Sequence, residues 1–302
     1  MSEKALKALL VTLGVVVVLW LAVTLLPGRG GSAGAPGKMA AFFEGISPDA
    51  VTAVTIEGPG THIELRREAT GWSVNGYAAD SSAVARFWTS VDSADLGDLV
   101  ARNPANHARM GVAADSTHKV TFTLAGGDTR VLLVGKSGPR YPTVYVRLPD
   151  DDNVYLLDSD LRASVAKVLP DWRDKRIVAV DTARVRRLSI WLPGGGYEVV
   201  RSDSVWNVAG GGEADASTVR SMLGELRDLR GTGFVEVTDT LGPAGRRIVA
   251  LNEAGDTLAR LELGKGKGDV WVRTRGKDTV FRLPGWRVER LVPEKKKVAG
   301  GS

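Results

Sequence analysis

Two stretches of this chain resemble each other closely, and their repetition limits what the chain can fold into. The first, GWSVNGYAADSSAV, begins at Gly71, and the second, VWNVAGGGEADASTV, begins at Val205. In each, a Trp in an alternating run is followed by a turn that contains Gly, and then by an Ala-Asp pair, Ser and Val. Self-similarity of this kind is the sequence signature of a repeated structural unit.

The similarity extends to both sides of these stretches in the same order. The flanking segments alternate between apolar and polar residues and are separated by short turns that contain Gly or Asp, which is typical of strands in hairpins. The matched segments are 51–57, 62–74, 119–136 and 143–157 in the first copy and 185–191, 197–208, 247–265 and 269–283 in the second. The sequence therefore predicts an α+β protein of two tandem repeats, each a mostly antiparallel β-sheet with one main packed helix.

The helix of each copy is predicted from its first turn and its apolar spacing. Asp80 and Asp215 stand where a carboxylate can accept the free backbone N–H groups of a first helical turn. Apolar residues then recur at helical spacing in both copies, namely Val84, Phe87, Trp88 and Val91 in the first and Val219, Met222, Leu223 and Leu226 in the second.

The Trp residues are interpreted as core residues, and the alternative is that Trp72, Trp191, Trp206 or Trp271 stacks on a carbohydrate.

The N-terminal segment has the composition of a membrane span. Residues 8–26 carry no charge, and about 20 apolar residues are needed to cross the hydrocarbon region as a helix. A cleaved signal peptide has an apolar region of only about 7–15 residues, so the segment is predicted to remain as an anchor. We expect a single pass through the inner (cytoplasmic) membrane with the bulk of the chain outside the cytoplasm, although Lys and Arg are nearly balanced across the span.

The domain organisation follows from these segments and from the composition between them. Gly, Ser, Ala and Pro predominate after the span, which is typical of a flexible linker. The predicted order is a transmembrane anchor at 1–28, a flexible tether at 29–48, the first repeat at 49–169, a basic joint at 170–183, the second repeat at 184–293 and a disordered tail at 294–302.

Composition and motifs give no catalytic, cofactor or metal site. The chain has no Cys, which excludes disulfides and thiolate chemistry, and its net charge of +5 comes with no nucleic-acid-binding motif. His62, His107 and His118 lack paired metal-ligand spacing and are predicted to lie on the surface. The Gly135-Lys136 pair lacks the remainder of a phosphate-binding loop. Because Gly264-Lys265 repeats it, both pairs are interpreted as a turn of the repeat.

The basic joint is the one candidate binding site. Its cations and those at the start of the second repeat outnumber the neighbouring Asp171, Asp174 and Asp181. One interpretation is an ion-pair network that fixes the two copies relative to each other. The other is a docking patch for an acidic partner, formed by Arg173, Lys175, Arg176, Arg184, Arg186 and Arg187.

Several of these features together resemble one bacterial family. They are the N-terminal anchor, the tandem Trp hairpins with Asp-led helices, the strands VYVR from Val144 and VWVR from Val270, and the joint DWRDKRIV from Asp171. This combination is similar to the domain-of-unknown-function family numbered forty-three forty. The resemblance implies an exported, membrane-anchored protein of the kind often encoded beside ABC transporter permeases and auxiliary components of gliding-motility-type transporters. The family has no assigned catalytic residues.

The expected function is therefore that of a non-enzymatic, extracytoplasmic accessory or scaffold protein associated with an ABC-type transporter. Its expected partners are permease or auxiliary subunits and the membrane, with no nucleic acid, cofactor or small-molecule substrate. The alternative is a module that binds an envelope glycan or anionic lipid through exposed Trp residues and the basic joint. An envelope hydrolase is a third reading, for which the sequence offers no acid–base or nucleophile set.

Overall fold

The computed structural model describes residues 36–235, 241–266 and 269–300. These residues divide into two compact units, the first containing 36–67 and 85–166 and the second containing 68–84 and 167–300. Each unit is considered on its own. The predicted anchor, residues 1–28, and the beginning of the predicted tether lie outside the described residues.

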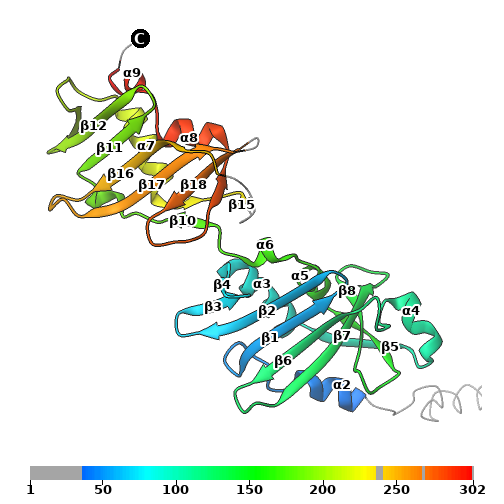
Figure 1. Ribbon diagram of the computed structural model, residues 1–302. Coiled ribbons are helices and arrows are strands. Elements are labelled where there is room, and N and C mark those ends of the chain that lie inside the picture. Colours follow the sequence, from blue (N-terminus) through cyan, green and yellow to red (C-terminus); the bar gives the residue numbers. More distant parts are fainter. Residues whose placement is uncertain (1–35, 236–240, 267–268, 301–302) are drawn as a thin grey trace, which may run out of the picture. The chain divides into compact units, whose positions relative to one another are not determined.

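The first sheet has nine strands among the described residues, in the spatial order β4-β3-β2-β1-β6-β7-β8-β9-β5 (Figure 1). From β6 to β9 each strand pairs antiparallel with the next along the chain, as expected where hairpin turns join the strands. The strands are β1 (Val51–Gly58), β2 (Thr61–Glu68), β3 (Gly71–Val74), β4 (Tyr77–Ala78), β5 (Asp95–Ala101), β6 (His118–Leu124), β7 (Thr129–Ser137), β8 (Thr143–Arg147) and β9 (Val154–Asp158). The accompanying helices are α2 (Pro36–Phe43), α3 (Ser81–Asp92), η1 (Pro104–Asn106), α4 (His107–Met110) and α5 (Leu161–Val165).

The second sheet has eight strands in the described part of the chain, in the order β13-β12-β11-β16-β17-β18-β19-β15. Its strands are β11 (Arg187–Leu192), β12 (Gly195–Ser202), β13 (Val205–Val208), β15 (Gly233–Phe234), β16 (Ala244–Leu251), β17 (Thr257–Lys265), β18 (Val270–Thr274) and β19 (Phe281–Leu283). A separate two-stranded sheet pairs β10 (Arg176–Val178) with β14 (Leu229–Arg230). The helices are α6 (Leu169–Trp172), η2 (Thr182–Arg184), α7 (Ala216–Arg227), α8 (Gly285–Leu291) and α9 (Lys295–Val298).

The two sheets agree in strand order place by place. The order β3-β2-β1-β6-β7-β8-β9-β5 corresponds to β13-β12-β11-β16-β17-β18-β19-β15, and the first sheet adds β4 at its end. In both, the long helix follows a Trp-containing hairpin, and the outermost strand, β5 or β15, comes after that helix in the sequence. The predicted α+β class with antiparallel sheets is confirmed.

The two predicted helix caps are confirmed. Asp80 Oδ1 accepts a hydrogen bond from the backbone N–H of Ala83 at 2.9 Å, and Asp215 Oδ1 accepts one from Thr218 at 2.7 Å. Such bonds satisfy donors that have no partner inside the helix. Hydrogen bonds from Ser217 and Thr218 also favour the ionised form of Asp215 and lower the pKa of its carboxyl to about 2.

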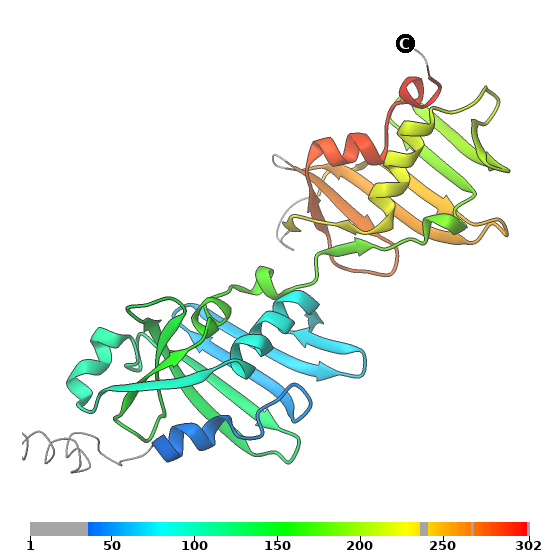
Figure 2. The same ribbon diagram turned by 180° about the vertical axis from the view of Figure 1, so that it is seen from behind.

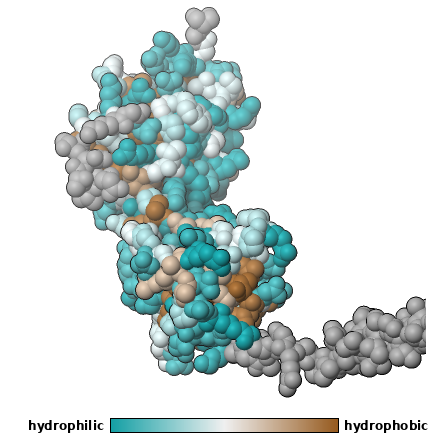
Figure 3. Space-filling model, turned by 90° about the vertical axis from the view of Figure 1, so that its right-hand side faces the viewer, coloured by the Kyte–Doolittle hydropathy of each residue, from teal (hydrophilic) through white to brown (hydrophobic). Residues whose placement is uncertain are grey.

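The surface seen in Figure 3 is mainly hydrophilic, with hydrophobic residues in a few limited areas. Within the described residues, the helices are too short or too polar to cross a bilayer. The uncharged run that predicts an anchor is not among these residues.

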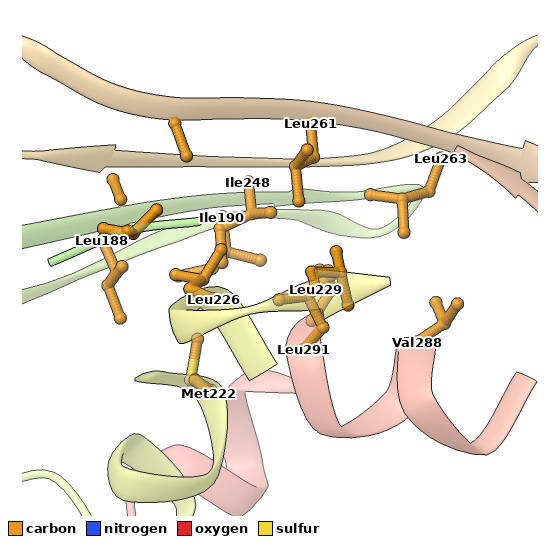
Figure 4. Packing of buried hydrophobic residues seen from close by; sticks show 14 of the residues in the cluster. Leu188, Ile190, Met222, Leu226, Leu229, Ile248, Leu261, Leu263, Val288 and Leu291 are labelled. Atoms are coloured by element: carbon orange, nitrogen blue, oxygen red, sulfur yellow. The ribbon is translucent and has the colours of Figure 1, made fainter. Parts of the chain in front are cut away.

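The core of the second unit lies between its sheet and its long helices. Figure 2 shows the yellow α7 and the red α8 across the near face of this sheet. Met222 and Leu226 of α7 and Leu291 of α8 are fully buried, and Figure 4 shows their side chains directed toward those of Ile190 and Leu261 on the strands. Burial of a side chain of this size contributes about 1.5–3 kcal/mol. The helical spacing of apolar residues therefore identified the face that packs on the sheet.

The core of the first unit contains an aromatic cluster. The ring of Phe87 on α3 stacks on Phe122 of β6 with centroids 6.1 Å apart, and Trp88 lies 6.3 Å from the same ring. Both α3 residues are buried. The interpretation of Trp88 as a core residue that covers the sheet is confirmed.

The prediction of a flexible tether over 29–48 is wrong for residues 36–48. This part contains α2, whose Met39 and Phe42 are buried, and Ile46 is buried after it. Arg130 on β7 donates hydrogen bonds to the carbonyl oxygens of Ala41 and Phe42, at 3.2 and 2.6 Å. These carbonyls belong to the last turn of α2, where they have no partner inside the helix and a cation is stabilising. Three apolar residues and this arginine thus hold the segment on the first unit.

The prediction of a disordered tail over 294–302 is wrong for residues 294–300. Helix α9 places Val298 in the core of the second unit, where its side chain is fully buried. The carbonyl of Val298 accepts the backbone N–H of Asp215 at 2.7 Å. The sequence did not predict this contact because Val298 follows three consecutive lysines, a composition that is typical of an exposed tail.

Candidate functional site

The candidate site is a groove in the second unit between β10, the start of β17 and the end of β18. Two pockets form it, with volumes of about 400 and 360 Å³. They adjoin each other because both are lined by Arg260, Thr274, Arg275 and Lys277. We call these two pockets together the basic groove.

The groove exists because β17 is longer than the ladder that it forms with β18. That ladder runs only from Leu261, opposite Thr274, to Lys265, opposite Val270. Residues 257–260 of β17 therefore extend past it, and a register shift at Leu258 bends this end through a β-bulge. The facing wall is formed by residues 176–179, which include β10. β10 pairs with β14 and not with β17, so no ladder fills the space beside the end of β17.

The lining of the groove is strongly basic. Among the described residues it contains one carboxylate, Glu262, and five cations, Arg176, Arg260, Arg273, Arg275 and Lys277. Glu262 Oε1 lies 3.2 Å from Arg260 Nη2, and its Oε2 lies 3.2 Å from Arg273 Nη2. The hydrogen bond from Arg260 and then that from Arg273 lower the pKa of the Glu262 carboxyl. Glu262 is therefore ionised at neutral pH and holds two guanidinium groups side by side.

The remaining three cations differ in how far their charges are compensated. Arg176 Nε lies 2.9 Å from Asp228 Oδ1, and Lys277 Nζ donates to the Arg176 carbonyl at 2.7 Å. The side chain of Arg275 is exposed and has no hydrogen bond or ion pair within the described ranges. Arg275 is thus the groove cation best placed to meet an anion from solution.

The structure does not bring the six predicted docking residues together at this site, since only Arg176 lines the groove. The guanidinium carbon of Arg173 lies 3.7 Å from the ring centroids of both Tyr77 and Phe234. Arg186 and Arg187 face Glu253 and Glu198 at 3.9 and 4.0 Å, Lys175 is half-buried, and Arg184 is exposed on η2. The ion pairs of Arg176, Arg186 and Arg187 lie inside the second unit, and a network that fixes the two copies relative to each other stays a prediction. Their use as a docking patch stays a prediction.

The sequence did not predict four of the groove cations, namely Arg260, Arg273, Arg275 and Lys277. The signal that could have found them is the segment RTRGK, in which cations occupy 273, 275 and 277. A spacing of two predicts side chains on the same side of an extended chain; in the structure β18 ends at Thr274, and Arg275 and Lys277 follow in the turn. Arg260 joins them because its carbonyl accepts the backbone N–H of Arg275 at 3.4 Å.

Comparison with family models gives a match to the family described as "Domain of unknown function (DUF4340)", over residues 72–246. This range is more than half of the chain. The chain belongs to this family. The resemblance noted from the sequence is thereby confirmed. Searches of curated proteins and of solved structures found no match.

The matched range of this DUF4340 protein begins at Trp72 in β3 and ends at Arg246 in β16. It includes Trp72, the whole second Trp hairpin and both long helices. Of the five groove cations it includes only Arg176, because the other four follow on β17, β18 and the next turn. Family membership therefore does not assign a role to the groove.

Two histidines of the DUF4340 chain are buried, so the prediction that all three are surface residues is wrong. His107 Nε2 lies 2.9 Å from the carbonyl oxygen of Asp152, and His118 Nδ1 lies 2.7 Å from Arg162 Nη1. The ring of His118 packs against Gly58, where a side chain would have no room. Burial and, second, the charge of Arg162 lower the pKa of His118 below 6.5. Within the described residues, no group of three or more His, Asp or Glu side chains is arranged to hold a metal ion.

We expect the stability of the first unit to depend on His118 in mildly acidic solution. Because the folded state lowers this pKa, the contribution of neutral His118 is fully present above 6.5 and is lost as the pH falls through the lower folded value. His118→Gln, which cannot titrate, should lose less stability than the wild type between about pH 7.5 and 5.5. Urea unfolding at both pH values measures this, with the exposed His62→Gln as control. Equal pH dependence in the wild type and His118→Gln would contradict the assignment.

The Gly-Lys pairs interpreted as turns lie instead inside strands, so that interpretation is wrong. Gly135 is in β7 and Gly264 is in β17. A Cβ at Gly135 would overlap the Met110 carbonyl, and one at Gly264 would overlap the indole of Trp271. Both glycines are required because another group packs directly on the strand.

The Trp residues considered for carbohydrate stacking differ in exposure. Trp271 is 2% exposed, which excludes it as a binding platform, and Trp72 and Trp206 are half-buried. Trp191 is 39% exposed, and the guanidinium of Arg247 lies 4.4 Å from its ring centroid. Of these four, Trp191 alone presents a large open ring.

Proposed function

We propose that this DUF4340 protein is a non-enzymatic, extracytoplasmic accessory or scaffold subunit associated with an ABC-type transporter of the gliding-like kind. In this proposal residues 1–28 form a single membrane span in the inner membrane. The body consists of two tandem copies of one α+β module, which bind permease or auxiliary subunits.

The observation that carries this proposal is the common strand order of the two sheets. Duplication of one ancestral module accounts for that order and for the collinear sequence segments more simply than two independent origins. Two such modules add binding surface, and the main feature of the second is a charged groove open to solvent. The anchor is supported by the uncharged run at 8–26.

Co-purification after mild detergent extraction tests the proposal. We expect the full chain to be recovered from the membrane fraction together with permease or auxiliary subunits. A variant in which a cleavable signal peptide replaces residues 1–28 should leave the membrane fraction and lose most of these partners. Repeated recovery of the full chain alone, or membrane retention of the variant without its span, would contradict the proposal.

A second candidate function is binding of an envelope glycan or anionic lipid, and Trp191 favours it. This ring is open to solvent and has Arg247 against it, an arrangement that suits stacking on a sugar beside an anionic group. Sedimentation with wall polymer and with liposomes tests this candidate. Binding that weakens with salt and with Trp191→Ala would support it, and no retention at low salt would exclude it.

A further inference from the structure

We propose that the basic groove binds a short, extended, acidic peptide segment of a partner protein. This inference deepens the proposed function. It rests on that function in one respect, namely that the partner is a protein. The occupant is argued from the charge of the groove, from the free strand end that borders it and from the chemistry of its lining.

Charge is the first argument. Five cations and one carboxylate line the groove, and that carboxylate is already bound by Arg260 and Arg273. Four of the cations are arginines, whose planar guanidinium groups bind carboxylates through paired hydrogen bonds. An occupant with several carboxylates is therefore favoured over a neutral or basic one.

The strand end is the second argument. Among the described residues, no strand pairs with residues 257–259 of β17 on the side away from β16, since the ladder with β18 starts at Leu261 and the Arg260 carbonyl already accepts the backbone N–H of Arg275. Unpaired strand edges bind extended peptides through main-chain hydrogen bonds. The bulge at Leu258 limits this edge to a few residues, so the bound segment is short.

The rest of the lining distinguishes a peptide from a lipid surface. Between the cations the groove is lined by the partly buried apolar residues Val178 and Leu258, with Ala259 of the core beside them. These can accept alternate apolar side chains of an extended segment. Membrane-surface binding uses large exposed apolar residues that enter the bilayer boundary. The large exposed apolar residues of the described chain, such as Trp191 and Trp286, do not line the groove.

Arg275 has the main binding role in this arrangement. Its side chain is exposed and unpaired among the described residues, so an incoming carboxylate replaces water and displaces no protein partner. Arg260 and Arg273 are already held side by side by Glu262 and supply a preorganised second contact.

The test is fluorescence anisotropy of a labelled peptide of about eight residues, in which aspartate and valine alternate, titrated with the full chain in detergent. We expect saturable binding that weakens as salt rises. Arg275→Gln should weaken it about tenfold, since one charge-assisted contact is lost. The control Arg220→Gln, with the same charge change on an exposed position of α7, should leave the affinity unchanged. The same peptide with N-methylated backbone amides should bind more weakly, because main-chain hydrogen bonds are lost.

The outcomes separate this inference from its alternatives. Equal affinities of Arg275→Gln and the wild type, or equal binding of a peptide with asparagine in place of aspartate, would overturn the inference. So would salt-sensitive retention on phosphatidylglycerol vesicles without peptide binding, which would assign the groove to a lipid surface. Unchanged urea unfolding of Arg275→Gln excludes misfolding as the cause of a weaker affinity. Absence of co-purified transporter subunits with intact peptide binding would count against the proposed function and leave the groove assignment standing.

Discussion

Replacing Glu225 by alanine is expected to lower the free energy of unfolding of the second unit by about 3 kcal/mol. Glu225 lies on α7 and is 7% exposed, and its Oε2 is 2.6 Å from Nη2 and 2.8 Å from Nε of Arg287 on α8. The substitution would leave the mostly buried Arg287 guanidinium without its carboxylate. A buried charge that loses its partner costs much more than an exposed one.

Urea unfolding of the full chain measures this loss, and two further variants locate it. Arg290 approaches the same carboxylate at 3.6 Å but is 54% exposed, so Arg290→Ala should cost less than about 0.5 kcal/mol. Replacing both partners, Glu225→Leu with Arg287→Met, should recover most of the stability because no charge is then left unpaired. A loss for Glu225→Ala as small as that for Arg290→Ala would show that the pair does not hold α7 and α8 together.

Gly264→Ala is expected to destabilise the same unit by about 2–3 kcal/mol. The added Cβ would lie 2.5 Å from Nε1 of Trp271 and closer still to two carbons of the indole. Trp271 is 2% exposed, so the ring has little space into which it can move. One methyl group therefore forces either the strand or the indole out of its packed position.

A matched glycine and a compensating substitution test the cause of this loss. Gly194 has no atom within 4 Å of an added Cβ, so Gly194→Ala should leave the free energy of unfolding nearly unchanged. Trp271→Leu should cost stability alone, yet its effect should be much smaller when combined with Gly264→Ala, because the overlap is then relieved. Strict additivity of the two substitutions would argue against direct contact as the cause.

Much of the fold could be predicted because its signals are local. The N-cap roles of Asp80 and Asp215 depend on atoms within three residues, and the buried face of each long helix follows from a period in the sequence. The α+β class followed from the order of hairpin signals, which needs no knowledge of distant contacts. The pairing of β10 with β14 was not predicted.

The features that were missed depend on contacts between distant parts of the chain. Residues 36–48 are rich in small residues, and only the packing of Met39 and Phe42 and the hydrogen bonds from Arg130 show that they are ordered. The groove has the same origin. Arg176 and Arg260 both line it because β17 extends beyond its ladder with β18. The length of that ladder cannot be predicted from the sequence of either strand alone.

The docking of α9 has a consequence for how the boundary of this module is drawn. Val298 fills part of the hydrophobic interior, and its carbonyl anchors the residue that caps α7. A shortened chain that stops at the end of the last β-strand or of α8 would therefore leave a cavity beneath α7. It would also lose the hydrogen bond that holds Asp215 at the start of that helix. The minimal folding unit of the second repeat therefore includes α9, and a fusion partner should be attached after that helix.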